Sequence, residues 1–130
     1  MKVKLQSTDS LQNYAAFNEQ GKGLFLGNDG KAVGPMQAVL MAAAGCSTID
    51  IVMILEKMKQ PLKNIEVDVD GTRRDEIPRT YTAIHFHYKL TGDLDKKKVQ
   101  RAIDLSLGKY CSVSKMLEKS AKITSSFEII

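Results

Sequence analysis

The residues with the clearest capacity for chemistry are two cysteines in different settings. Cys46 lies within a long apolar stretch, and Cys111 follows 65 positions later (111 − 46), just before a short polar-to-apolar segment. A thiolate is the nucleophilic form of cysteine, and two neighbouring thiols can form a disulfide. We expect apolar burial to oppose the thiolate of Cys46. We expect Cys111 at the entrance of a helix, where free N–H groups would lower its pKa.

The residues that would tune Cys46 are charged. Asp50 lies one helical turn after Cys46 and would by itself disfavour a thiolate there. Arg73 falls on the apolar side of a predicted strand, so it points inward in the expected alternation. We therefore predict that Arg73, or failing that Arg74, pairs with Asp50 and presents positive charge to the thiol.

The apolar stretch predicts a central helix over residues 34–60. Pro35 suits its first turn, and nearly every side chain from Met36 to Leu55 is apolar. Such a helix must be buried on most sides, by the sheet of its own chain or by a second copy. Its length approaches the roughly 20 apolar residues that span a bilayer. The four alanines among its apolar positions, the acidic Asp50 and the lack of an interfacial anchor favour a buried helix and no membrane contact.

The rest of the chain alternates between strand and helix patterns. We expect an N-terminal meander of about three strands over residues 1–33, a strand pair over 63–91, helices over 94–120 and a final strand over 122–130. We expect Ser112 or Ser114 as the N-cap of the last helix. This order predicts one α+β domain with antiparallel sheets around the central helix. A chain of 130 residues can hardly surround such a helix alone, so we expect self-association.

The pair His85 and His87 admits two interpretations. Both face outward on one predicted strand, which is compatible with a metal site, but the acidic row Glu66, Asp68 and Asp70 of the neighbouring strand can complement them. We favour complementation and predict neither a metal nor a cofactor.

Composition narrows the class of protein. The chain is 43% hydrophobic and 26% charged with a formal net charge of +4, which is typical of a globular domain. The densest basic run, Lys96 to Lys98 followed by Arg101, lacks interleaved aromatic residues, so we expect a solvated helix face and no nucleic-acid binding. Two cysteines and an alternating N-terminus indicate a reduced, cytoplasmic compartment. On this evidence alone the cysteines could be two structural core thiols.

The motifs around both cysteines carry a family resemblance. Gly-Pro-Met-Gln-Ala-Val-Leu-Met-Ala-Ala-Ala-Gly before Cys46, together with Lys-Tyr-Cys-Ser-Val-Ser around Cys111, resembles the OsmC/Ohr family, in particular its uncharacterised OsmC-like branch. The resemblance covers essentially the whole chain. It implies an OsmC-like fold in an intertwined homodimer, and reduction of organic hydroperoxides. By position Cys46 matches the peroxidatic cysteine and Cys111 the resolving one, with the disulfide reduced by a dithiol of lipoyl type.

Two departures from that family pattern affect the expected activity. The peroxidase members carry a Glu where this chain has Met36, beside the uncharged Gln37, and they supply an Arg from the N-terminal strands, whereas the first Arg here is Arg73. Either Arg73 with Asp50 replaces that pair, with Gln37 in support, or the activity is weak. The alternative function is a non-catalytic or redox-sensing dimeric module that binds a small apolar ligand near Cys46.

Overall fold

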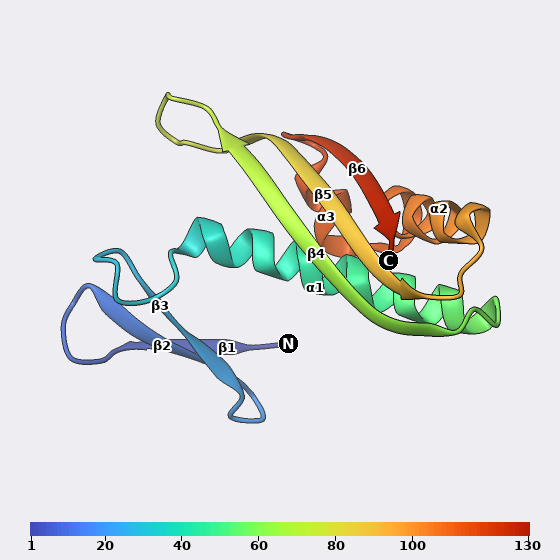
Figure 1. Cartoon of the computed structure of the whole chain (residues 1–130). Helices are drawn as coiled ribbons and strands as arrows, with labels where there is room; N and C mark the ends of the chain where they lie inside the picture. Colours follow the sequence, from blue (N-terminus) through green and yellow to red (C-terminus); the bar gives the residue numbers. More distant parts are fainter. The chain divides into compact units, whose positions relative to one another are not determined.

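The computed structural model describes all residues, 1–130, and they form two compact units, Met1–Val39 and Leu40–Ile130. In the first unit, β1 (Val3–Ser7), β2 (Asn13–Asn18) and β3 (Gly23–Gly27) form an antiparallel sheet in the order β1-β2-β3. These strands, blue in Figure 1, confirm the meander predicted from the alternating N-terminal sequence.

The long helix α1 spans Pro35–Lys57, within the predicted range. Its first turn is closed by Gln37, whose side-chain oxygen accepts from the Gly34 N–H at 3.0 Å, half of a capping box. By length and composition α1 is apolar enough to cross a membrane, but 22% of its most apolar 18-residue window is buried inside the chain.

Burial of α1 follows a single stripe. Its buried residues recur every four positions: Ala43, Ser47, Ile51 and Leu55. Large apolar side chains on its other faces remain exposed in the single chain, with Met41 58%, Ile49 62% and Met53 51% exposed. Of the two expected coverings of this helix, the chain's own sheet buries only one stripe, because one sheet can cover only one side of a cylinder; burial by a second copy stays a prediction.

The second unit contains a three-stranded sheet in the order β4-β5-β6. The strands β4 (Leu62–Arg73) and β5 (Tyr81–Gly92) are antiparallel, whereas β6 (Lys122–Ile129) runs parallel to β5. This sheet is therefore mixed and not antiparallel throughout as predicted. The expected alternation of β5 is confirmed, since its inward residues Ile84, Phe86, Tyr88 and Leu90 are all fully buried.

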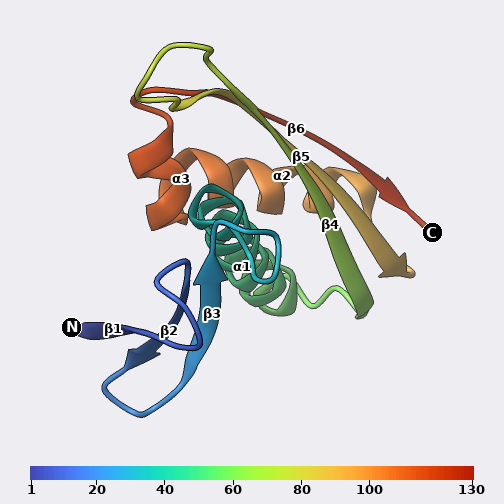
Figure 2. The same ribbon diagram turned by 90° about the vertical axis from the view of Figure 1, so that its left-hand side faces the viewer.

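The remaining helices connect β5 to β6. The helix α2 (Lys96–Leu105) begins at Asp95, whose carboxylate accepts from two backbone N–H groups, and a π-helical turn, η1 (Ser106–Tyr110), extends it. The short helix α3 (Ser112–Leu117) follows with Cys111 as its N-cap, so neither predicted serine holds that position. Figure 2 shows α1, α2 and α3 on the same face of the β4–β5–β6 sheet. The core lies between that face and the helices.

Candidate active site

The two thiols and one carboxylate meet in the second unit. The Sγ atoms of Cys46 and Cys111 and a carboxylate oxygen of Asp50 all lie within 4.8 Å of one another. Cys46 and Asp50 share one side of α1 because they are four residues apart, and Cys111 reaches them from the junction of η1 and α3. Both cysteines are free thiols. The fold thus brings together two thiols, Cys46 and Cys111, that are 65 positions apart in the sequence.

Cys111 is fully buried, and its surroundings have opposing effects on the pKa of its thiol. Burial raises the pKa of Cys111, the hydrogen bond from the Ser114 N–H to its Sγ (3.4 Å) opposes that rise, and the neighbouring Cys46 thiol adds to it. The expectation of a lowered pKa is therefore wrong. The predicted position at a helix entrance is correct, but α3 has only six residues and the loss of hydration outweighs its N-terminal N–H groups.

Asp50 is held by the π-helical turn. The hydroxyl of Ser106, the first residue of η1, lies 3.2 Å from the carboxylate oxygen Oδ2 of Asp50 and 3.1 Å from the carbonyl oxygen of Ser47. Both atoms are acceptors for its proton, and Ser106 is fully buried. One serine therefore fixes η1 on α1 and orients the carboxylate beside the thiols. Single π-helical turns inside helices frequently mark functional sites.

A second buried contact fixes α1 on the sheet. The Tyr88 hydroxyl on β5 donates to Ser47 Oγ at 2.7 Å, and Ser47 Oγ lies 3.2 Å from the Ala44 carbonyl oxygen. Both Tyr88 and Ser47 are fully buried, and burial raises the pKa of Tyr88, so the phenol stays a neutral donor. Because Ser47 directly follows Cys46, this contact sets the depth at which the thiol is presented.

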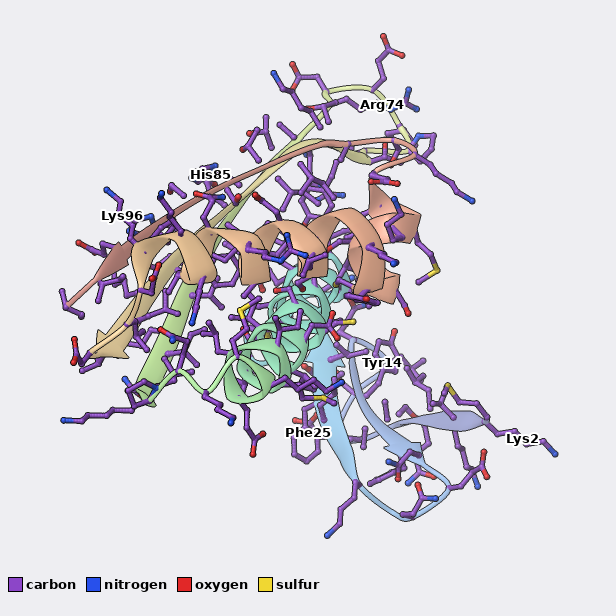
Figure 3. All side chains as sticks on the ribbon, turned by 90° about the vertical axis from the view of Figure 1, so that its right-hand side faces the viewer. Lys2, Tyr14, Phe25, Arg74, His85 and Lys96 are labelled. Atoms are coloured by element: carbon purple, nitrogen blue, oxygen red, sulfur yellow. The ribbon has the colours of Figure 1, made fainter.

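Arg73 does not join the site, which corrects the prediction that it neutralises Asp50. Its side chain is exposed and its Nε donates to the Arg79 carbonyl at 2.7 Å. Arg73 is the last residue of β4, next to a register shift whose extra residue, Thr82, lies on β5, and at this strand end its side chain bonds to the backbone of the hairpin. The alternative, Arg74, lies at the far end of the hairpin (Figure 3), where its NH1 pairs with Glu76 at 3.9 Å.

Gln37 is nine positions before Cys46 (46 − 37) and belongs to the first compact unit, whereas the cysteine cluster belongs to the second. Its side chain is occupied with capping Gly34. The Gly-Pro-Met-Gln start of the helix could have indicated this, because Gln at the third helical position is typical of a capping box.

A groove opens beside Asp50. It has a volume of about 480 Å³ and an apolar lining with two cations: Asp50, Met53, Ile54, Lys57, Met58, Arg101, Leu105 and Tyr110. Neither Lys57 nor Arg101 takes part in an ion pair within the chain. The prediction that Arg101 lies on a solvated helix face is correct, since its side chain is exposed, but the sequence interpretation missed its place in the groove lining. Its spacing of four from Leu105 was the available signal, because such residues share one side of a helix.

The outward histidines bond to β6 and not to the acidic row of β4. His85 contacts Thr124 Oγ1 (2.7 Å) and Ser126 Oγ (2.9 Å), and His87 contacts Ser126 Oγ at 2.7 Å. Lys89 meets the acidic row as expected, with its Nζ 3.2 Å from Asp68. In the strand register His87 lies opposite Asp68 and His85 opposite Asp70, as predicted, but only Lys89 bonds to the acidic row.

The chain is similar in sequence to known proteins. The family model described as OsmC-like protein matches residues 27–126. The E. coli K12 protein YhfA is 52% identical over 106 residues, which cover 80% of this chain and 79% of the relative. This chain belongs to the OsmC-like family.

Solved structures share the fold. A hypothetical protein from Aquifex aeolicus VF5 is 30% identical with a TM-score of 0.87, covering 99% of this chain and 96% of that one. An organic hydroperoxide resistance protein OsmC from Legionella pneumophila has a TM-score of 0.75 at 16% identity, covering 98% and 95%. These matches confirm the predicted family and its α+β fold.

Proposed function

We propose that this protein reduces organic hydroperoxides with Cys46 as the peroxidatic and Cys111 as the resolving cysteine. The observation that carries the proposal is the meeting of both Sγ atoms and the Asp50 carboxylate within 4.8 Å. Two structural thiols would not need a half-buried carboxylate beside them that a buried serine holds in place. The groove lined by Asp50 offers an apolar substrate a place beside this carboxylate, next to the thiols.

The chemistry takes three steps. The Cys46 thiolate attacks the O–O bond, becomes a sulfenic acid and releases an alkoxide, which takes up the thiol proton to form the alcohol. Asp50, oriented by Ser106, is the group placed to accept that proton and return it. The Cys111 thiol then condenses with the sulfenic acid to form a disulfide and water. An external dithiol, of lipoyl type by family resemblance, restores both thiols by exchange and is itself oxidised to a disulfide.

Arg101 and Lys57 are the cations that line the groove with Asp50, and neither takes part in an ion pair in the chain. Both side chains are exposed, so they offer positive charge to an anionic group of a substrate in the groove. The apolar residues Met53 and Leu105 favour an alkyl hydroperoxide over hydrogen peroxide. Oxidative-stress defence in a reduced, cytoplasmic compartment is the setting that fits such a cycle.

The exposed faces of α1 support a homodimer as the working form. Met41, Ile49 and Met53 are each more than half exposed, and such a row of large apolar side chains is typical of a protein–protein contact. We expect Ile49→Asp to convert the protein to monomers in analytical ultracentrifugation. Glu56→Lys, an exposed charge change on the same helix, is the matched control and should leave the dimer intact. A wild-type monomer at micromolar concentration would contradict the proposal.

Peroxide kinetics with cysteine variants test the catalytic proposal. We expect rapid consumption of cumene hydroperoxide and slow consumption of hydrogen peroxide, with dihydrolipoamide as reductant. Cys46→Ser should abolish turnover. Cys111→Ser should complete a single turnover and accumulate a Cys46 sulfenic acid, detected as a dimedone adduct by mass spectrometry. Equal, slow oxidation of all three proteins would refute the mechanism.

The same experiment separates the second candidate function, a dimeric module that binds a small apolar ligand. The apolar lining of the groove favours it. Such a module would bind ligands equally well in the wild type and in Cys111→Ser, because binding does not need a second thiol. A redox sensor would form the disulfide with peroxide but be reduced slowly by dithiols.

A further inference from the structure

The three groups at the centre of the site form a set of ligands that suits a thiophilic metal ion. Cys46, Asp50 and Cys111 offer two sulfur atoms and one carboxylate oxygen, all within 4.8 Å of one another. Around a tetrahedral zinc ion, with Zn–S near 2.3 Å and Zn–O near 2.1 Å, ligand atoms lie roughly 3.5–4 Å apart. A contraction of about 1 Å therefore closes the three groups around an ion. The sequence predicted no metal site, because only the fold brings these residues together.

Two hydrogen bonds orient these ligands from outside. The Ser106 hydroxyl lies 3.2 Å from Asp50 Oδ2, and the Ser114 N–H donates to Cys111 Sγ at 3.4 Å. Contacts of this kind to the ligating groups are characteristic of protein metal sites and tune their affinity. Both serines are fully buried, so these contacts are not exchanged with solvent.

We propose that the reduced protein binds one zinc ion through Cys46, Cys111 and Asp50. Binding converts both thiols to thiolates and releases two protons, without a change in oxidation state. A water or chloride completes the tetrahedron, as in sites with three protein ligands. The three anionic ligands leave a net charge of −1 around Zn²⁺, and Lys57 and Arg101 in the adjoining groove offset it.

This binding goes beyond the proposed peroxidase and regulates the same thiols. A zinc-bound thiolate is tied to the metal and cannot form the intramolecular disulfide, so zinc and oxidation exclude each other. The reduced protein would keep zinc, and oxidation to the disulfide would release it.

Cobalt(II) is the probe for this site, because it adopts the same geometry and its thiolate complexes are coloured. Anaerobic titration of reduced wild type should saturate at one equivalent, with sulfur-to-cobalt charge-transfer bands and tetrahedral d–d bands, and zinc should displace it. Cys46→Ser and Cys111→Ser should each lose those bands. Asp50→Asn, which replaces an anionic ligand by a neutral amide, should weaken the affinity by more than the roughly 10- to 100-fold that loss of an outer contact to a ligand costs. His85→Ala/His87→Ala, which removes the other strong metal ligands, should bind like wild type.

Several results would overturn the proposal. These are the absence of charge-transfer bands in reduced wild type, equal binding by the disulfide form, or loss of binding in the double histidine variant with retention in the cysteine variants. If a cysteine variant fails to fold, protection of both wild-type thiols from alkylation by one equivalent of zinc decides the question. None of these measurements uses peroxide, so an inactive protein that binds cobalt would refute the proposed peroxidase alone.

Discussion

The buried contact between Ser47 and Tyr88 gives the sharpest quantitative prediction, because its two deletions are unequal. In Tyr88→Phe, Ser47 Oγ loses one donor at 2.7 Å but keeps the Ala44 carbonyl at 3.2 Å. No buried group is left without a partner, so we expect the loss of one net hydrogen bond, about 1 kcal/mol.

In Ser47→Ala the phenol has lost its partner. The Tyr88 side chain is fully buried, so water cannot replace the serine, and an unsatisfied hydroxyl costs about 1–3 kcal/mol. Alanine offsets roughly 0.5 kcal/mol of this by its higher helix propensity. In a Tyr88→Phe background the same substitution should be neutral or slightly stabilising. The double-mutant cycle should therefore give a coupling energy of about 1–2 kcal/mol.

Equilibrium unfolding in urea, followed by far-UV circular dichroism, measures these differences. All four proteins should be compared at one concentration under reducing conditions, because association would add to the apparent stability. Additive effects of the two substitutions, or a larger cost for Tyr88→Phe than for Ser47→Ala, would refute the contact as described. A changed m value in one variant would show that the native states are not comparable.

Three further predictions concern the thiols, the groove and the sheet. Burial raises the folded-state pKa of Cys111 above its ordinary value of about 8.5, so the unfolded chain loses this proton first as the pH rises. The free energy of unfolding should therefore fall above that pH, by up to about 1.4 kcal/mol per pH unit. Urea unfolding from pH 7.5 to 9.5 should show this slope, and Cys111→Ala should remove it. The double variant Lys57→Ala/Arg101→Ala should raise the KM for a hydroperoxide that carries a carboxylate by about tenfold or more. The KM for cumene hydroperoxide, which has no charge, should stay nearly unchanged. Equal effects on both KM values would contradict recognition of charge in the groove. Gly71→Ala should lower the free energy of unfolding by about 1–3 kcal/mol, because the added Cβ would lie 2.6 Å from the ring of the buried Tyr81. Thermal or urea unfolding measures this change. An unchanged midpoint would show that the ring moves aside without cost.

Arg73 shows where the alternation of a strand stops predicting which side chains face inward. Alternation correctly assigned the inward residues of β5 and those of β4 from Ile65 to Val69, because side chains on a regular strand alternate between its two faces. It failed at Arg73 because this residue ends β4, where the side chain bonds to the Arg79 carbonyl and not to Asp50. Alternation does not reveal where a strand leaves the part of the sheet that covers the site.

The sequence by itself determined the helix and strand order, the inward faces of the sheet and the family, because these depend on local periodicity and on motifs within single segments. It also singled out Cys46, Asp50 and Cys111. Only the tertiary structure decided that the three meet within 4.8 Å, that Ser106 orients the carboxylate and that Arg101 lines the groove beside it. These facts depend on how α1, the π-helical turn and α2 pack on one sheet. Contacts between segments far apart in the sequence cannot be read from the periodicity of any one segment.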